Sequence, residues 1–177
     1  MNHLITGGQR SGKSKYAEEL ALTLSESPIY LATSRIWDPQ HRERIEQHQK
    51  RRGKMWTTIE EEKYLSRHDF SGKVVLLDCI TLWLTNFFFD NQQNVEKSLS
   101  EAKTEIDSLL QQNCTIIMVT NEIGLGGHPE SEMAMKFHDL QGWMNQYIAK
   151  YADKAVLMVS GIPVEIKGTE VLLKKQI

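Results

Sequence analysis

Short apolar runs alternate with longer amphipathic stretches along most of this chain. Five of the runs are largely aliphatic and mostly rich in β-branched residues, as is typical of strands buried on both faces of a sheet: His3–Thr6, Ile29–Thr33, Val74–Asp78, Thr115–Thr120 and Ala155–Ser160. Three intervening stretches place apolar residues at helical spacing: Lys13–Leu24, Glu96–Leu110 and Met133–Tyr151. This alternation predicts an α/β fold in which helices cover both faces of a mostly parallel sheet.

Two further segments depart from the alternation. The C-terminal residues Val164–Leu173, interrupted by Lys167-Gly168-Thr169, predict a hairpin at one edge of the sheet. Residues Gln40–Arg52 have good helical propensity, yet Ile45 is the only aliphatic residue in this polar, basic stretch. We expect such a helix to face solvent, a ligand or another subunit instead of the core.

Length and charge narrow the class of protein. A chain of 177 residues suits one domain, residues 1–177, and its net charge of −2 without a basic tail does not favour nucleic acid or a membrane surface as the main partner. Cys79 and Cys114 lie inside or beside apolar runs, which indicates buried free thiols in a reducing compartment. With no leader or membrane span in the sequence, we expect a soluble, cytoplasmic protein.

The strongest chemical signal follows the first predicted strand and opens the first predicted helix. It is the eight-residue phosphate-binding pattern G-x-x-x-x-G-K-[ST], formed by Gly7, Gly8, Gln9, Arg10, Ser11, Gly12, Lys13 and Ser14. The glycines let backbone N–H groups surround an anion at a helix N-terminus, Lys13 reaches the outer phosphates and Ser14 ligates Mg²⁺. The sequence therefore predicts a P-loop NTPase-like fold that binds a nucleoside triphosphate.

Two carboxylates follow predicted strands at the edge where this loop should lie. Asp78 ends the strand Val74–Asp78 and either holds Mg²⁺ opposite Ser14 or caps a helix that starts near Thr81. Glu122 follows the strand Thr115–Thr120 and is either a site residue or a turn acid.

His48 is the most informative residue of the basic segment. On a helix it would lie roughly 10 Å from His41 along the axis, which is too far for the two to share a zinc ion. His48 is then either a surface histidine or a nucleophile that attacks a phosphorus atom. The cations beside it, Lys50, Arg51 and Arg52, either neutralise a triphosphate or form a solvated basic face.

Six segments occur in an order that resembles a known family over nearly the whole chain. They are Gly7–Ser14, Tyr30–Ser34, Arg44-Ile45-x-x-His48, Asp78–Asn86, Thr120–Gly126 and Val159–Pro163. Together they are similar to the bifunctional adenosylcobinamide kinase / adenosylcobinamide-phosphate guanylyltransferase of cobalamin biosynthesis. The phosphate loop is generic, whereas Arg-Ile-x-x-His and Asn-Glu-Ile-Gly-Leu-Gly in this spacing are distinctive.

The resemblance implies two reactions. A nucleoside triphosphate phosphorylates the hydroxyl of the aminopropanol arm of adenosylcobinamide. The residue matching the family histidine, His48, then attacks the α-phosphorus of GTP, and the bound GMP passes to adenosylcobinamide-phosphate to give adenosylcobinamide-GDP. The resemblance also implies a homotrimer, with GTP and ATP as nucleotide substrates. Beyond the phosphate loop, it implies nucleotide contacts at Thr33, Ser34, Arg35, Gln49, Lys50, Arg51, Arg52, Glu60 and Asp78.

Some positions depart from the family pattern or stay open. The family often carries arginines where this chain has Glu132, Met135, His138 and Trp143, which either weakens one activity or changes a subunit contact. The apolar run with Trp83, Phe87, Phe88 and Phe89 either borders the corrinoid or packs in the core or against a subunit.

The sequence leaves two alternative functions open. One is a P-loop kinase of another small hydroxylated substrate, in which His48 takes no part in the reaction. The other is a slow nucleotide-binding switch protein.

Overall fold

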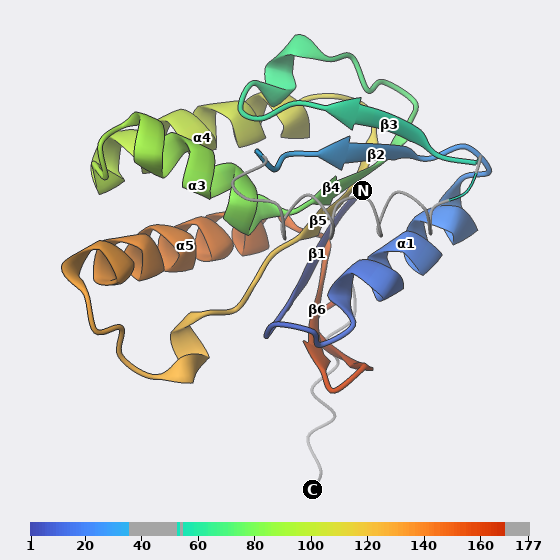
Figure 1. Ribbon diagram of the computed structural model, residues 1–177. Coiled ribbons are helices and arrows are strands. Elements are labelled where there is room, and N and C mark those ends of the chain that lie inside the picture. The colour runs from blue at the N-terminus through green and yellow to red at the C-terminus, as the bar shows by residue number, and fades with distance from the viewer. Residues whose placement is uncertain (36–52, 54, 169–177) are drawn as a thin grey trace, which may run out of the picture.

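The computed structural model describes residues 1–35, 53 and 55–168 of the chain. Within these residues seven strands form one sheet in the order β3-β2-β4-β5-β1-β6-β7, and every neighbouring pair is parallel except the antiparallel β6 and β7 (Figure 1). The strands are β1 (Asn2–Gly7), β2 (Ile29–Ala32), β3 (Thr57–Glu60), β4 (Val74–Asp78), β5 (Thr115–Val119), β6 (Lys154–Val159) and β7 (Ile162–Lys167). The helices are α1 (Lys13–Leu24), α3 (Ile80–Asp90), α4 (Val95–Leu110) and α5 (Glu132–Tyr151), with short 3₁₀ turns η1 (Leu65–Arg67) and η2 (Gly124–Gly126).

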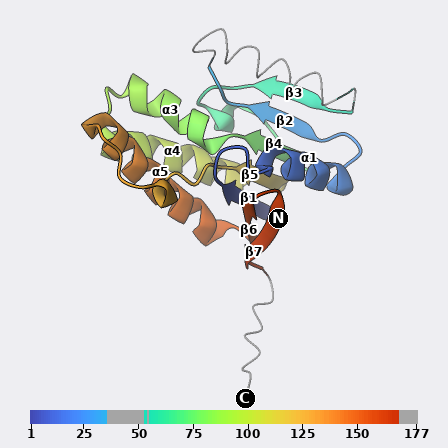
Figure 2. The ribbon, with the colours of Figure 1, turned by 60° about the horizontal axis from the view of Figure 1, so that its bottom comes forward.

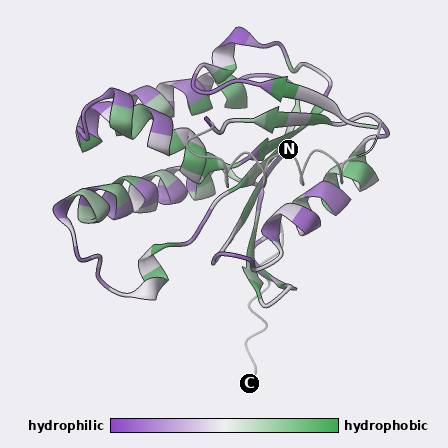
Figure 3. Ribbon diagram, in the orientation of Figure 1, coloured by the Kyte–Doolittle hydropathy of each residue, from purple (hydrophilic) through white to green (hydrophobic). Residues whose placement is uncertain are grey.

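Helices cover both faces of the sheet, as Figures 1 and 2 show from two directions: α1 lies on one face, and α3, α4 and α5 lie on the other. Strand β4 illustrates why. Its Leu76 side chain packs in the cluster that contains Ala17 and Ala21 of α1, whereas Val75 and Leu77 point to the opposite cluster beneath α3, α4 and α5. A strand buried on both faces has no polar side, and Figure 3 shows the central strands as largely hydrophobic.

The predicted fold class is confirmed, because five strands and three helices appear where the apolar pattern places them. One strand was missed. The four residues of β3 are mostly exposed and alternate little in polarity, since β3 is an edge strand that pairs only with β2 among the described residues. The predicted helix over Gln40–Arg52 lies outside the described residues.

The prediction of a C-terminal hairpin at the sheet edge is confirmed by β6 and β7, whereas the predicted break at Lys167-Gly168-Thr169 lies partly outside the described residues. The chain turns at Ser160 and Gly161, and β7 then runs antiparallel to β6 with Val159 opposite Ile162. Both turn residues have positive φ, 51° at Ser160 and 83° at Gly161, which is the backbone that tight hairpin turns require. Residues from Thr169 onward lie outside the described part.

None of the helices in the described part of the chain combines the length and the apolar character needed to cross a bilayer.

Candidate nucleotide site

The phosphate loop lies at the carboxyl edge of the sheet, between the end of β1 at Gly7 and the start of α1 at Lys13. Lys13 is only 7% exposed, and its Nζ donates to the Gly8 carbonyl at 2.6 Å. Burial lowers the pKa of this ammonium group. The hydroxyl of Ser11 is buried and has no hydrogen-bond partner among the described residues. A cation bonded to its own loop and an unpaired hydroxyl both fit an anion that would take them as partners.

The loop rests on the β6–β7 turn. The amide of Gly161 donates to the Ser11 carbonyl at 3.0 Å. A Cβ at Gly12, where φ is 96°, would lie 3.3 Å from the Gly161 Cα. These contacts pack the segment Val159–Pro163 against the phosphate loop. It is one of the six segments that carry the family resemblance.

Gly7 allows the closest approach between the loop and the sheet. Its φ is 149°, and a Cβ there would lie 2.5 Å from the Met158 carbonyl oxygen. We expect Gly7→Ala to lower the free energy of unfolding by about 3 kcal/mol, because it adds both backbone strain and a clash with backbone that does not yield. Denaturant unfolding measures this loss. Gly8→Ala is the matched control, since a Cβ at Gly8 meets nothing within 4 Å; equal losses in the two variants would contradict the expectation.

Asp78 lies at the end of β4, near the phosphate loop. Its Oδ2 accepts a hydrogen bond from the Tyr30 hydroxyl at 2.9 Å, and its charge acts on Lys13, whose pKa it raises against the effect of burial. The alternative of a helix cap is not supported, because Cys79 occupies the N-cap position of α3 and no side-chain cap bond is made there. The structure thus places Asp78 where its charge acts on the lysine of the phosphate loop.

Glu122 has the turn role that the sequence left open. Its Oε1 accepts from the Gly124 amide at 2.8 Å, which closes the turn before η2. Its own amide donates to the Gly7 carbonyl at 3.0 Å, so the loop that begins at Glu122 is joined to the phosphate loop.

Thr33, Ser34 and Arg35 follow β2 at the same edge. Thr33 is fully buried and its hydroxyl donates to the Cys79 carbonyl at 3.0 Å, while Ser34 donates to the Arg35 carbonyl at 2.9 Å. Arg35 lines a pocket of about 350 Å³ together with Glu60. Two predicted nucleotide contacts therefore share one pocket.

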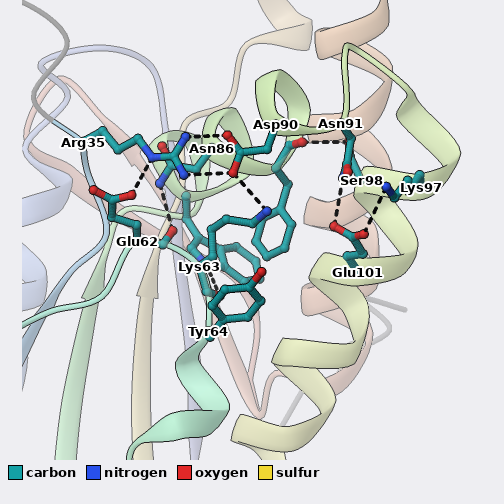
Figure 4. A network of polar contacts seen from close by, with 12 residues as sticks. Arg35, Glu62, Lys63, Tyr64, Asn86, Asp90, Asn91, Lys97, Ser98 and Glu101 are labelled. Atoms are coloured by element: carbon teal, nitrogen blue, oxygen red, sulfur yellow. Dashed lines mark hydrogen bonds and ion pairs between the residues drawn. The ribbon is translucent and has the colours of Figure 1, made fainter.

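Four polar residues in or beside this pocket were given no role by sequence reasoning: Glu62, Lys63, Asn86 and Asp90. Figure 4 shows them joined to Arg35 in one network. Asn86 is fully buried in the largely apolar helix α3, and an amide in such a run, at the end of the segment Asp78–Asn86, is the signal that points to it in the sequence. Lys63 and Asp90 carry no such signal, because their pairing depends on how three segments meet.

The remaining predicted site residues, His48, Gln49, Lys50, Arg51 and Arg52, lie outside the described residues. Arg35 is the last described residue before that segment.

The positions that depart from the family pattern lie on α5. Met135 and Trp143 are each 47% exposed, and Glu132 forms an ion pair with Lys136 at 2.6 Å. Met135 and His138 line a second pocket of about 330 Å³ beside the η2 loop. Of the aromatic run in α3, Trp83, Phe87 and Phe88 are core residues, whereas Phe89 is exposed.

Comparison with known proteins completes the assignment. The family model described as cobinamide kinase / cobinamide phosphate guanyltransferase matches residues 3–166. The bifunctional adenosylcobalamin biosynthesis protein CobU of Escherichia coli (strain K12) is 40% identical over 182 residues, covering 93% of this chain and 98% of its own length. CobP of Pseudomonas aeruginosa, also described as a bifunctional adenosylcobalamin biosynthesis protein, is 36% identical over 173 residues, covering 95% and 98%. Among solved structures, the flagellar accessory protein FlaH from Methanocaldococcus jannaschii has a TM-score of 0.45 and 17% identity, covering 94% of this chain and 78% of that one, which is too distant to add to the argument. The family match over nearly the full chain agrees with the phosphate loop and its neighbours at the sheet edge, and the chain belongs to the cobinamide kinase / cobinamide phosphate guanyltransferase family.

Proposed function

We propose that this chain, as one domain in the cytoplasm, phosphorylates adenosylcobinamide and then transfers GMP from GTP to adenosylcobinamide-phosphate. The observation that carries the proposal is the phosphate loop with its buried Lys13 beside Asp78, in a chain whose family is named for both reactions. Lys13 and the loop amides hold the triphosphate, and the loop's fixed geometry orients it for in-line displacement.

In the transfer reaction His48 is the nucleophile. A ring-nitrogen lone pair of His48 attacks the α-phosphorus of GTP, the bond from that phosphorus to the bridging oxygen breaks, and pyrophosphate leaves with the electron pair. A phosphate oxygen of the corrinoid then attacks the same phosphorus and releases the imidazole. Splitting one displacement into two in this way is ordinary nucleophilic catalysis.

The residues at the loop fit a magnesium ion that arrives with the nucleotide. The hydroxyl of Ser14 and the carboxylate of Asp78 are hard oxygen donors of the kind that Mg²⁺ prefers. Residues 1–35, 53 and 55–168 contain no group of three His, Cys, Asp or Glu side chains able to hold a metal by themselves, so phosphate oxygens would complete the shell. When bound, the ion would neutralise charge on the phosphates.

Labelled nucleotides test the two activities. We expect GTP labelled at the α-phosphorus to leave acid-labile, base-stable label on the protein, and GTP or ATP labelled at the γ-phosphorus to label adenosylcobinamide. A chain that takes no α-label but phosphorylates another small alcohol is the alternative kinase. Release of phosphate without any transfer would indicate the switch protein.

We expect Asp78→Asn to raise the Mg²⁺ concentration that gives half-maximal kinase rate by about tenfold or more, because the amide loses the charge that attracts the ion. A magnesium titration at saturating nucleotide measures the shift. Asp69→Asn is the control, since Asp69 precedes β4 and so lies at the opposite end of that strand. An unchanged titration for Asp78→Asn would remove this residue from the metal site.

A homotrimer is part of the same proposal. It is supported by the outer edge strand β7, whose Ile162, Val164 and Ile166 all lie exposed in the single chain. Light scattering is expected to give three times the chain mass of 20.4 kDa. A mass of one chain at micromolar concentration would contradict it.

A further inference from the structure

The guanidinium group of Arg35 is enclosed by carboxylates from two other segments (Figure 4). Its Nη1 and Nη2 donate to the two oxygens of Asp90 at 2.7 and 2.9 Å, and its Nε donates to Glu62 at 2.5 Å. Asp90 is the last residue of α3, and Glu62 lies just after β3. A bidentate pair of this kind fixes the plane of the guanidinium as well as its position.

Lys63 holds Asp90 from another direction. Its Nζ lies 3.1 Å from Asp90 Oδ2 and 4.6 Å from the centre of the Phe87 ring, and the residue is buried. Two cations thus face the two carboxylates of Glu62 and Asp90. The hydrogen bond that Arg35 donates, with that from Lys63, holds the pKa of Asp90 well below its usual range, so Asp90 is a carboxylate at neutral pH.

The backbone around Arg35 is also fixed from α3. Asn86 Nδ2 donates to the carbonyls of Thr33 and Glu62, each at 2.8 Å, which joins the chain after β2 to the chain after β3. Helix α3 therefore sets both the main chain before Arg35 and the orientation of its side chain.

This arrangement suits a residue whose exact position matters. An isolated surface ion pair adds little to stability, and Arg35 has a 26% exposed side chain in a pocket that it shares with Glu60. A guanidinium fixed by two carboxylates meets a ligand without losing further side-chain freedom, which favours binding.

We propose that Asp90 is a positioning residue for guanylyl transfer: it contacts Arg35, not the nucleotide, and holds that guanidinium where the nucleotide meets it. The inference rests on the proposed function, because it takes Arg35 as a nucleotide contact. It assigns to the end of α3 a part in GTP binding that neither its sequence nor its family resemblance indicates.

The test follows the rate of protein labelling by α-labelled GTP as GTP concentration is varied. For Asp90→Asn we expect the half-saturating GTP concentration to rise about tenfold, the effect of loosening one charge-assisted contact, with the final amount of label unchanged. Asp90→Glu keeps the charge but displaces the carboxylate by one methylene, so it should give a smaller shift in the same direction. This variant keeps the test decisive if the amide variant does not fold.

Glu101→Gln is the matched control. Glu101 accepts from Asn91 at 2.9 Å and pairs with Lys97 at 3.8 Å, in a second polar group beside Asp90 that Figure 4 shows on the α4 side. We expect its GTP dependence to match that of the unmodified chain. If the effect of Asp90→Asn only reflected weaker packing between α3 and α4, the half-saturating GTP concentration would rise in Glu101→Gln as well. That result would overturn the proposal.

A double-mutant cycle separates positioning from direct contact. If Asp90 acts through Arg35, then Asp90→Asn has no further effect in an Arg35→Ala background. Additive shifts would mean that Asp90 meets the nucleotide itself, and an unchanged half-saturating concentration in Asp90→Asn would mean that it has no part in binding; either outcome overturns the proposal. Absence of label on the unmodified chain is a separate result, since it removes the proposed function itself and this inference with it.

Discussion

Replacing His48 with alanine is expected to reduce protein labelling by α-labelled GTP by about 10⁴-fold or more, because no other group would form the covalent bond to phosphorus. The kinase step needs no imidazole, so phosphorylation of adenosylcobinamide by γ-labelled nucleotide should continue in the same variant. Separate loss of one activity is the result that distinguishes a bifunctional enzyme from a simple P-loop kinase.

His41→Ala is the control for this experiment, since His41 lies seven residues away in the same segment. It should label normally. Label retained by His48→Ala would exclude His48 as the attachment point, and loss of both activities in that variant would instead indicate a role in nucleotide binding.

Replacing Lys13 with alanine should lower the rates of both reactions by about 10³-fold, the usual cost of removing a preorganised charge from a transferring phosphate. In the structure this ammonium is buried and donates a hydrogen bond to the Gly8 carbonyl, across the phosphate loop. Initial rates with each labelled nucleotide measure the effect.

The next lysine of the same helix provides the comparison. Lys15 has a 74% exposed side chain and pairs only loosely with Glu19, at 3.8 Å. Lys15→Ala should therefore keep both rates. If Lys13→Ala lost one activity and kept the other, the two reactions would not share the phosphate loop, and a second nucleotide site would have to be sought.

Much of the fold is predictable from the sequence because central parallel strands carry a strong local signal. The run Val74–Asp78 is apolar because α1 covers one face and α3, α4 and α5 cover the other. Strand β3 has no such signal, since the mostly exposed sequence Thr57–Glu60 becomes a strand only by pairing with β2. The turn between β6 and β7 is a related case, because Ser160 and Gly161 form it with positive φ angles although their composition is less typical of a turn than that of Lys167-Gly168-Thr169.

The same distinction applies to the site. Contiguous chemistry, such as the phosphate loop and the acid that ends β4, is visible in the sequence. The network around Arg35 is not, because Glu62, Lys63 and Asp90 come together only when β3 and α3 are placed against β2. Glu62, Lys63 and Asp90 belong to no sequence motif, so only the folded structure identifies them as one group.

The hydrogen bond from Gly161 to Ser11 has a consequence for biosynthesis of the chain. The phosphate loop is translated early, whereas the β6–β7 turn that contacts it is translated some 150 residues later, as the positions of Ser11 and Gly161 show. A nascent chain therefore cannot form this contact with the phosphate loop until the turn has been made, so the contact is completed only late in the synthesis of the domain.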